Sequence, residues 1–220
     1  MATVVSLRSH LVEELMDLFD AESQLTKALP KLAQAAASKP LRAAFQKHLR
    51  ETRGHVTRLN QALRSLGHKP RSKTCEAMKG LLEEGQELVG GAEPGALQDA
   101  MIITAAQKVE HYEIATYGTV RTYAQVLGEK QVAALMAQTL KEEKAADKKL
   151  TRIAEGQVNR QAAREFHQQK STVAAATETA ATALEKGAEW VGSKVGGTVR
   201  RIKKAIPRTS AADRGKRKKR

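Results

Sequence analysis

Four long segments of the chain repeat apolar residues at steps of three and four positions, and this pattern constrains the fold more than any other feature. Steps of this size place the side chains on one face of an α-helix, which then packs against other helices. The first segment runs through Leu11, Leu15, Leu18, Glu22, Leu25, Leu29 and Leu32. No alternating apolar and polar stretch is flanked by turn residues, so the pattern predicts an all-α protein.

Glycine and proline residues divide these patterns into separate helices. The predicted helices are 6–37, 39–66, 75–90, 96–127 and 129–155. Ser38 is expected to cap the second helix and Gly156 to end the last one. Four of the helices are more than twice the usual length of about 11–12 residues, and short turns join them in two pairs. Two αα-hairpins linked by a short crossover helix predict a four-helix bundle.

Acidic residues interrupt the apolar stripe of every long helix near its middle. The residues on or beside the four stripes are Glu22, Glu51, His55, Glu110, Glu113, Glu143 and Asp147. A buried carboxylate without a partner is costly, so it binds a proton, a basic side chain or a metal ion. Internal salt bridges would explain any one of these acids, but the same positions contain no lysine. A centre with two metal ions explains all of them together.

Several sequence motifs resemble the YciE/YciF family of bacterial ferritin-like stress proteins. They are Leu25-Thr-Lys-Ala-Leu-Pro-Lys-Leu32, His48-Leu-Arg-Glu-Thr52, Cys75-Glu-Ala-Met-Lys-Gly-Leu-Leu-Glu-Glu-Gly85, and Ala105-Ala-Gln-Lys-Val-Glu-His-Tyr-Glu-Ile-Ala115 with Tyr117-Gly-Thr119. The resemblance covers about residues 6–157. It implies a ferritin-like four-helix bundle, a homodimer and a dimetal centre, but no established substrate.

The same resemblance implies a set of metal ligands in this sequence. The matching acidic positions are Glu22, Glu51, Glu110, Glu113, Glu143 and Asp147, with His55 beside them. The wider ferritin-like pattern places Glu and His three apart on two helices. Here Glu51 and His55, and likewise Glu143 and Asp147, are four apart. Such an oxygen-rich site suits hard ions, with two iron ions expected first and manganese as the alternative.

Three further residues of the bundle have two interpretations each. His48 is either a ligand or a hydrogen-bonded core histidine, and Tyr117 either bonds a ligating carboxylate or only packs. Cys75 is either a reactive thiol at a helix start or a small buried residue. His111 is expected to point away from the inward stripe.

Positive charge is concentrated near the C-terminus. The formal net charge is +14, and residues 158–220 contain 16 Lys and Arg against 5 Asp and Glu. We therefore expect a bundle at 1–157 and a basic tail at 158–220, partly disordered or helical. A broken apolar stripe runs from Val173 to Ile206. The tail could contact DNA, an anionic membrane or the bundle, or simply remain solvated.

Two classes of function follow from these features. The first is a redox metalloprotein that oxidises ferrous iron or consumes peroxide or dioxygen under stress. The second is a binding protein with a structural metal and a tail that anchors it to DNA or an anionic surface. A single cysteine, no apolar run of about 18 residues and no signal-peptide core predict a cytoplasmic location.

Overall fold

The structure is a computed structural model that describes residues 5–71 and 73–205, with side chains omitted at 169 and 187–205. The chain divides into two units, Met1–His167 and Gln168–Arg220. The described part of the first unit holds five complete α-helices: α1 (Leu7–Ala35), α2 (Lys39–Ser65), α3 (Glu76–Gly90), α4 (Ala96–Val126) and α5 (Lys130–Ile153). Each begins and ends within two residues of its predicted bounds. No strand occurs in the described ranges, which confirms the all-α prediction.

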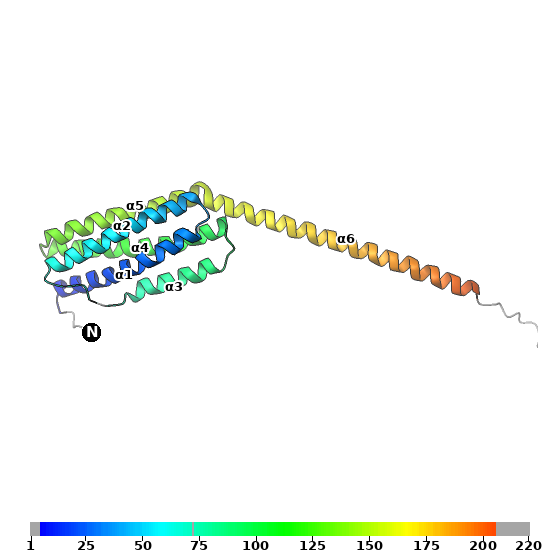
Figure 1. The fold of residues 1–220 in the computed structure, drawn as a ribbon, viewed down its shortest axis with the longest axis horizontal. Coiled ribbons are helices and arrows are strands. Elements are labelled where there is room, and N and C mark those ends of the chain that lie inside the picture. Colours follow the sequence, from blue (N-terminus) through cyan, green and yellow to red (C-terminus); the bar gives the residue numbers. More distant parts are fainter. Residues whose placement is uncertain (1–4, 72, 206–220) are drawn as a thin grey trace, which may run out of the picture. The chain divides into compact units, whose positions relative to one another are not determined.

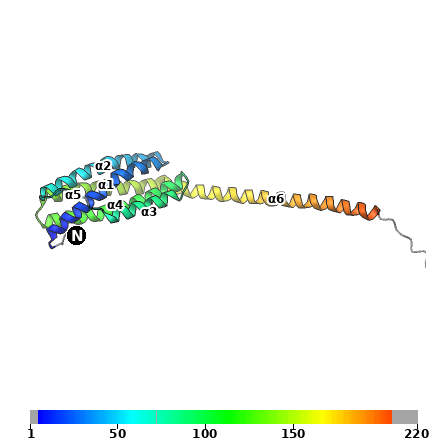
Figure 2. The same ribbon diagram turned by 60° about the horizontal axis from the view of Figure 1, so that its bottom comes forward.

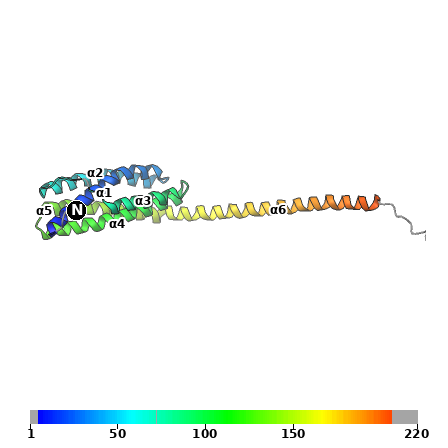
Figure 3. The same ribbon diagram turned by 90° about the horizontal axis from the view of Figure 1, so that it is seen from below.

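The four long helices form a bundle of two hairpins, α1 with α2 and α4 with α5 (Figure 1). The hairpins contact each other between α2 and α5 and between α1 and α4. Their axes follow a common direction (Figure 3). The crossover helix α3 lies against α4 and α1, outside the four long helices (Figure 2). This arrangement confirms the predicted ferritin-like bundle with one long connection.

The predicted end at Gly156 is wrong. The helical chain continues through a π-helical turn at Ala154–Val158 into α6 (Asn159–Ala205). A π turn accommodates one extra residue per turn, so the chain passes Gly156 without leaving the helix. Val158 is buried in the first unit, and Glu165 accepts a hydrogen bond from the backbone N–H of Ala96.

The part of α6 from Gln168 onward belongs to the second unit. Its described apolar side chains, Val173 and Leu184, are exposed. The predicted apolar stripe beyond position 186 and residues 206–220 of the predicted basic tail lie outside the side chains or residues that the structure describes. Among the described residues, no helix is long and apolar enough to cross a membrane.

The turn between α1 and α2 is held by a residue from a third helix. Ser38 makes no side-chain capping bond, contrary to the prediction. Instead the buried carboxylate of Asp99, in the first turn of α4, accepts hydrogen bonds from the N–H groups of Ala37 (2.8 Å) and Ser38 (2.7 Å). Two otherwise unpaired backbone donors are thereby satisfied.

The apolar core consists of two clusters with a polar layer between them. One cluster contains Leu11, Leu15 and Leu18 of α1, and the other contains Leu25 and Leu29 of the same helix. Glu22 lies between these two groups in the sequence and is completely buried. Each of the four long helices contributes at least one buried polar residue to this layer. The core therefore surrounds a polar centre at the middle of the bundle.

Candidate metal centre

Six ionisable side chains meet in the polar layer. They are Glu22 of α1, His48 and His55 of α2, Glu110 and Glu113 of α4, and Glu143 of α5, and each is at most 5% exposed. Their positions on the inward helical stripes explain why they converge, because all four stripes face the bundle axis. Ligand atoms of these residues form two groups with geometry suited to metal ions.

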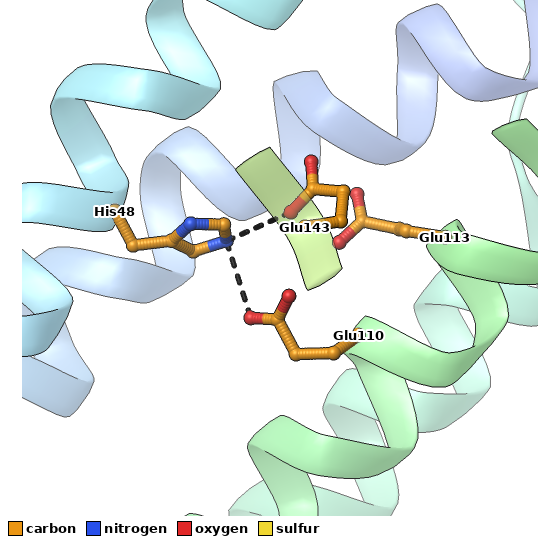
Figure 4. Close-up of side chains that lie close together, drawn as sticks. All are labelled: His48, Glu110, Glu113 and Glu143. Atoms are coloured by element: carbon orange, nitrogen blue, oxygen red, sulfur yellow. Dashed lines mark ion pairs between the residues drawn. The ribbon is translucent and has the colours of Figure 1, made fainter. Parts of the chain in front are cut away.

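The first group consists of His48, Glu110, Glu113 and Glu143, whose ligand atoms lie within 4.8 Å of one another. Figure 4 shows the four side chains pointing toward one another from three helices. The Nε2 atom of His48 lies 3.3 Å from Oε1 of Glu110 and 3.7 Å from Oε2 of Glu143. One nitrogen and several carboxylate oxygens thus surround a single point.

The second group consists of Glu22, His55 and Glu143. The Nδ1 atom of His55 lies 2.8 Å from Oε1 of Glu143 and 3.1 Å from Oε1 of Glu22. Glu143 therefore belongs to both groups and directs a different oxygen to each. This arrangement suits a carboxylate shared by two cations.

Several of these buried oxygens have no hydrogen-bond partner within the described part of the chain. They include both oxygens of Glu113 and one oxygen each of Glu22 and Glu110. A buried carboxylate without a partner costs several kcal/mol or takes up a proton. Cations placed in the two groups would satisfy these oxygens, so the residues present fit a metal centre.

The alternative of internal salt bridges accounts for only part of the cluster. His48 and His55 are its only basic residues among the six, whereas four carboxylates share the layer. Even with both imidazoles protonated, two negative charges remain. Two bound protons, or the positive charge of bound metal, are needed to neutralise them.

The electrostatics of the metal-free cluster favour bound protons. Burial raises the pKa of Glu110 to about 8 and raises the pKa values of Glu22 and Glu113 as well. Burial alone would lower the pKa of His48 and His55. The neighbouring carboxylates outweigh it and raise these pKa values to about 9 and about 10. Metal ions would therefore displace protons on binding.

A second set of contacts orients the candidate ligands. The hydroxyl of Tyr117, which is fully buried, donates a hydrogen bond of 2.5 Å to Oε1 of Glu22. The Nε2 atom of His55 lies 2.9 Å from Oε2 of Glu142, which also pairs with Arg58. A carboxylate on the far nitrogen fixes the histidine tautomer, leaving Nδ1 free to bind a metal.

Glu142 was not predicted from the sequence. It lies one position before Glu143, off the inward stripe, and only its contact with His55 reveals its role. The Arg58 guanidinium pairs with Glu142 and donates a hydrogen bond of 2.9 Å to the hydroxyl of Thr139. The three-residue spacing of His55 and Arg58 on one helix face is the signal that could have indicated a shared partner.

Glu51 and Asp147 are not brought into either group. The Glu51 side chain is 23% exposed, pairs with Lys47 and lies 3.9 Å from Nδ1 of His48. The neighbouring imidazole of His48 and the ammonium of Lys47 lower the pKa of Glu51 to about 2. Asp147 accepts a hydrogen bond from Gln107 and lies 3.4 Å from the exposed His111. Their role as ligands stays a prediction.

Cys75 is a buried thiol rather than an exposed one. Its Sγ atom lies 3.1 Å from the hydroxyl of Tyr112 and accepts a hydrogen bond from the backbone N–H of Met78. Burial raises the pKa of Cys75 to about 11. Because the thiolate is the reactive form, this environment favours the structural interpretation over the reactive one.

Known proteins are similar to this chain in both sequence and fold. Protein YciF of Escherichia coli (strain K12) is 46% identical over 163 residues, which are 74% of this chain and 96% of that protein. The crystal structure of the E. coli stress protein YciF superposes with a TM-score of 0.68 at 44% identity, covering 71% of this chain and 99% of that one.

Two further structures are similar. YcfI from Rhodopseudomonas palustris matches with a TM-score of 0.66 at 39% identity, covering 68% of this chain and 96% of that one. A protein from Xanthomonas campestris shares the fold at 20% identity, with a TM-score of 0.58 and coverage of 73% and 99%. A family model described as "Domain of unknown function (DUF892)" matches residues 6–163. Together with the YciF similarity, this match shows that the chain belongs to the DUF892 family, in agreement with the family resemblance of its motifs.

Proposed function

We propose that this protein holds two metal ions, iron in preference to manganese, and uses them to oxidise ferrous iron or to consume peroxide or dioxygen. The observation that supports this most is the position of Glu143, which directs one oxygen to each of two ligand groups. A carboxylate between two cations is the usual way to build a dinuclear centre in a four-helix bundle.

The side chains divide the work in this proposal. Glu22, His55 and Glu143 hold one ion, and His48, Glu110, Glu113 and Glu143 hold the other. A pair of ferrous ions supplies two electrons to an oxidant. Tyr117 holds the Glu22 carboxylate in place, and Glu142 holds the His55 ring. The two apolar clusters on either side surround the layer with a medium of low dielectric constant, which strengthens the charge interactions within it.

A small apolar cavity beside the cluster has room for a small oxidant. It has a volume of about 60 Å³ and lies between α1, α3 and α4, with Leu25, Leu81 and Val109 in its walls. His48 and Glu110 of the cluster also line it. A cavity of this size accepts a diatomic molecule or a peroxide beside the centre.

The biological setting of the proposal comes from the relatives. The E. coli YciF structure is described as that of a stress protein, and we carry this role over to the present chain. A cytoplasmic homodimer is part of the same proposal, by analogy with the family.

Metal analysis and ferrous oxidation test the proposal together. Protein purified from its native host should contain near-stoichiometric iron or manganese, and the ferrous form should react with peroxide or dioxygen faster than ferrous ion in buffer. The Glu143→Gln variant should bind neither metal ion and should not accelerate the oxidation of ferrous iron. Glu83→Gln, an exposed substitution on α3, is the matched control and should change neither. Oxidation no faster than in buffer would leave the metal with a structural role.

A second candidate function rests on the charge of the tail. Residues 158–220 contain 16 basic and 5 acidic residues, which is typical of segments that bind polyanions. In this alternative the metal only stabilises the bundle, and the tail anchors the protein to DNA or an anionic surface. A metal-loaded sample that binds polyanions but does not accelerate ferrous oxidation would support it.

A further inference from the structure

A second and larger opening also reaches the candidate metal centre. It is a cleft of about 550 Å³ between α2 and α5. His48 and Glu110 line it, so its inner end touches the candidate ligands. Its volume is in the range of about 300–1,000 Å³ that is typical of small-molecule sites, which occur between the helices of bundles.

The cleft has apolar walls and a basic opening. Phe45 and Leu150, both buried, and Ala146 contribute apolar surface. Lys148, Lys149 and Arg152, from the last turns of α5, are exposed and also line the cleft. None of the three forms an ion pair with another described residue, whereas Lys47 across the cleft is paired with the lining carboxylate of Glu51. The opening of the cleft therefore carries three positive charges that have no acidic partner among the described residues.

This combination defines the chemistry of a ligand. Cations entering here would be repelled by the three basic side chains before reaching the carboxylates, so the cleft suits an anion. An inorganic anion would leave the walls of Phe45, Ala146 and Leu150 without contacts. A carboxylate carried on an apolar chain satisfies both parts, because its head pairs with the cations and its chain buries apolar surface.

We propose that the α2–α5 cleft binds an organic monocarboxylate, with the carboxylate at Lys148, Lys149 and Arg152 and the apolar chain against Phe45, Ala146 and Leu150. The role of this acid as a substrate or effector of the centre rests on the proposed metal function, but its binding does not. The tail of this chain is excluded as the occupant by its own charge, since its basic residues would be repelled by the opening.

Calorimetric titration of the metal-free full chain with decanoate tests the proposal. One decanoate should bind per chain, whereas decanol and inorganic phosphate, which each lack one half of the recognised chemistry, should bind more weakly by about tenfold or more. The double variant Lys149→Gln/Arg152→Gln should weaken decanoate binding by about tenfold. Lys141→Gln/Lys144→Gln, on the same helix but outside the cleft lining, is the matched control and should bind as the parent does.

A third variant tests the apolar wall. Ala146→Phe fills the cleft and should abolish decanoate binding, while the charge variants keep the test valid if this one does not fold. Decanoate affinity unchanged in Lys149→Gln/Arg152→Gln would place the ligand elsewhere and overturn the proposal. Phosphate binding as tight as decanoate would overturn it too, because the walls would then contribute nothing.

The metal content of the same samples separates this proposal from the previous one. Lys149→Gln/Arg152→Gln should retain the metal content of the parent while losing decanoate, because neither residue belongs to a ligand group. A parent protein that binds decanoate but no metal would refute the metal function and leave the cleft assignment intact. The reverse result would refute only the cleft.

Discussion

At the scale of a single residue, Glu143 is a buried carboxylate that lowers the stability of the bundle and contributes to both ligand groups of the candidate metal centre. A leucine at this position would continue the apolar stripe of α5 between Met136 and Leu150. The carboxylate instead is fully buried and has neither oxygen in a hydrogen bond of good geometry within the described residues. Proteins depart from the packing rule in this way chiefly at functional positions.

The cost of burying an unpaired carboxylate also predicts that Glu113→Gln stabilises the metal-free protein. Both oxygens of Glu113 lack partners among the described residues, and burial raises its pKa well above the usual value. Glutamine has nearly the same shape, needs no proton and can donate to neighbouring carboxylates. The free energy of unfolding at pH 8 should rise by about 1–3 kcal/mol. Urea denaturation in the presence of a chelator measures it.

Two observations would check that prediction. The same variant should lose metal, because it removes one ligand of the first group. Glu83→Gln, at an exposed position, is the control and should change neither quantity. A destabilised Glu113→Gln protein would mean that the carboxylate has a partner in solution that the described contacts omit.

The pKa shifts predict that the metal-free protein becomes less stable as the pH rises. The pKa of Glu110 is raised from 4.5 to about 8, and that of His48 from 6.5 to about 9. Both groups bind protons more tightly in the folded chain, so their stabilisation is complete below the unfolded pKa and disappears as the pH passes the folded pKa. Glu51, with its pKa lowered to about 2, loses its contribution only below about pH 4.5.

Thermal melts between pH 5.5 and 8.5 provide the measurement. The Tm of the chelator-treated protein should fall across this range. The increase in Tm that Mn²⁺ produces should grow over the same range, because the metal competes with the bound protons. A Tm of the metal-free protein that stays level or rises with pH would contradict the shifts.

At the scale of the helices, periodicity was enough to predict the bundle but not the rotation of each helix. The stripe of α2 contains His48 and His55, and Glu51 lies between them at its edge. Steps of three and four fit both edge and centre, so the sequence alone could not separate a buried ligand from a partly exposed acid. The helix end predicted at Gly156 was wrong for another reason. A glycine also fits within a π-helical turn, and tertiary contacts decide whether such a turn forms.

The cap of the α1–α2 turn gives an element-scale prediction. Asp99 accepts two backbone hydrogen bonds, from Ala37 and Ser38, and is 2% exposed. Asp99→Ala leaves both donors unpaired and should lower the free energy of unfolding by about 2–3 kcal/mol. Ser38→Ala, at the position that the sequence favoured as the cap, should change it by less than about 0.5 kcal/mol. Equal losses from the two substitutions in denaturant titrations would contradict this assignment of the cap.

At the scale of the whole molecule, the boundary of the bundle can be tested by truncation. The sequence placed it after residue 157, whereas Val158 is 2% exposed and Glu165 bonds the first N–H of α4. A chain ending at 157 loses both contacts, and its free energy of unfolding should be lower by about 2 kcal/mol than that of a chain ending at 167. The chain ending at 167 should match the full-length protein. Equal stability of the two truncated chains would support the earlier boundary.

The remaining segment is defined by its charge, and that charge predicts binding to polyanions. Residues 187–220 contain 12 of the 16 basic residues that follow position 157. Contacts between such residues and phosphates release counterions, so affinity falls steeply with salt, by about 10³-fold or more between 50 and 200 mM for six to ten contacts. The full-length protein should bind duplex DNA or anionic vesicles at low salt with this dependence. Deleting 187–220 should abolish binding without changing the metal content or Tm of the bundle. Binding that survives the deletion would assign it instead to the basic side chains of α5, and a lower Tm would mean that the segment packs as part of the fold.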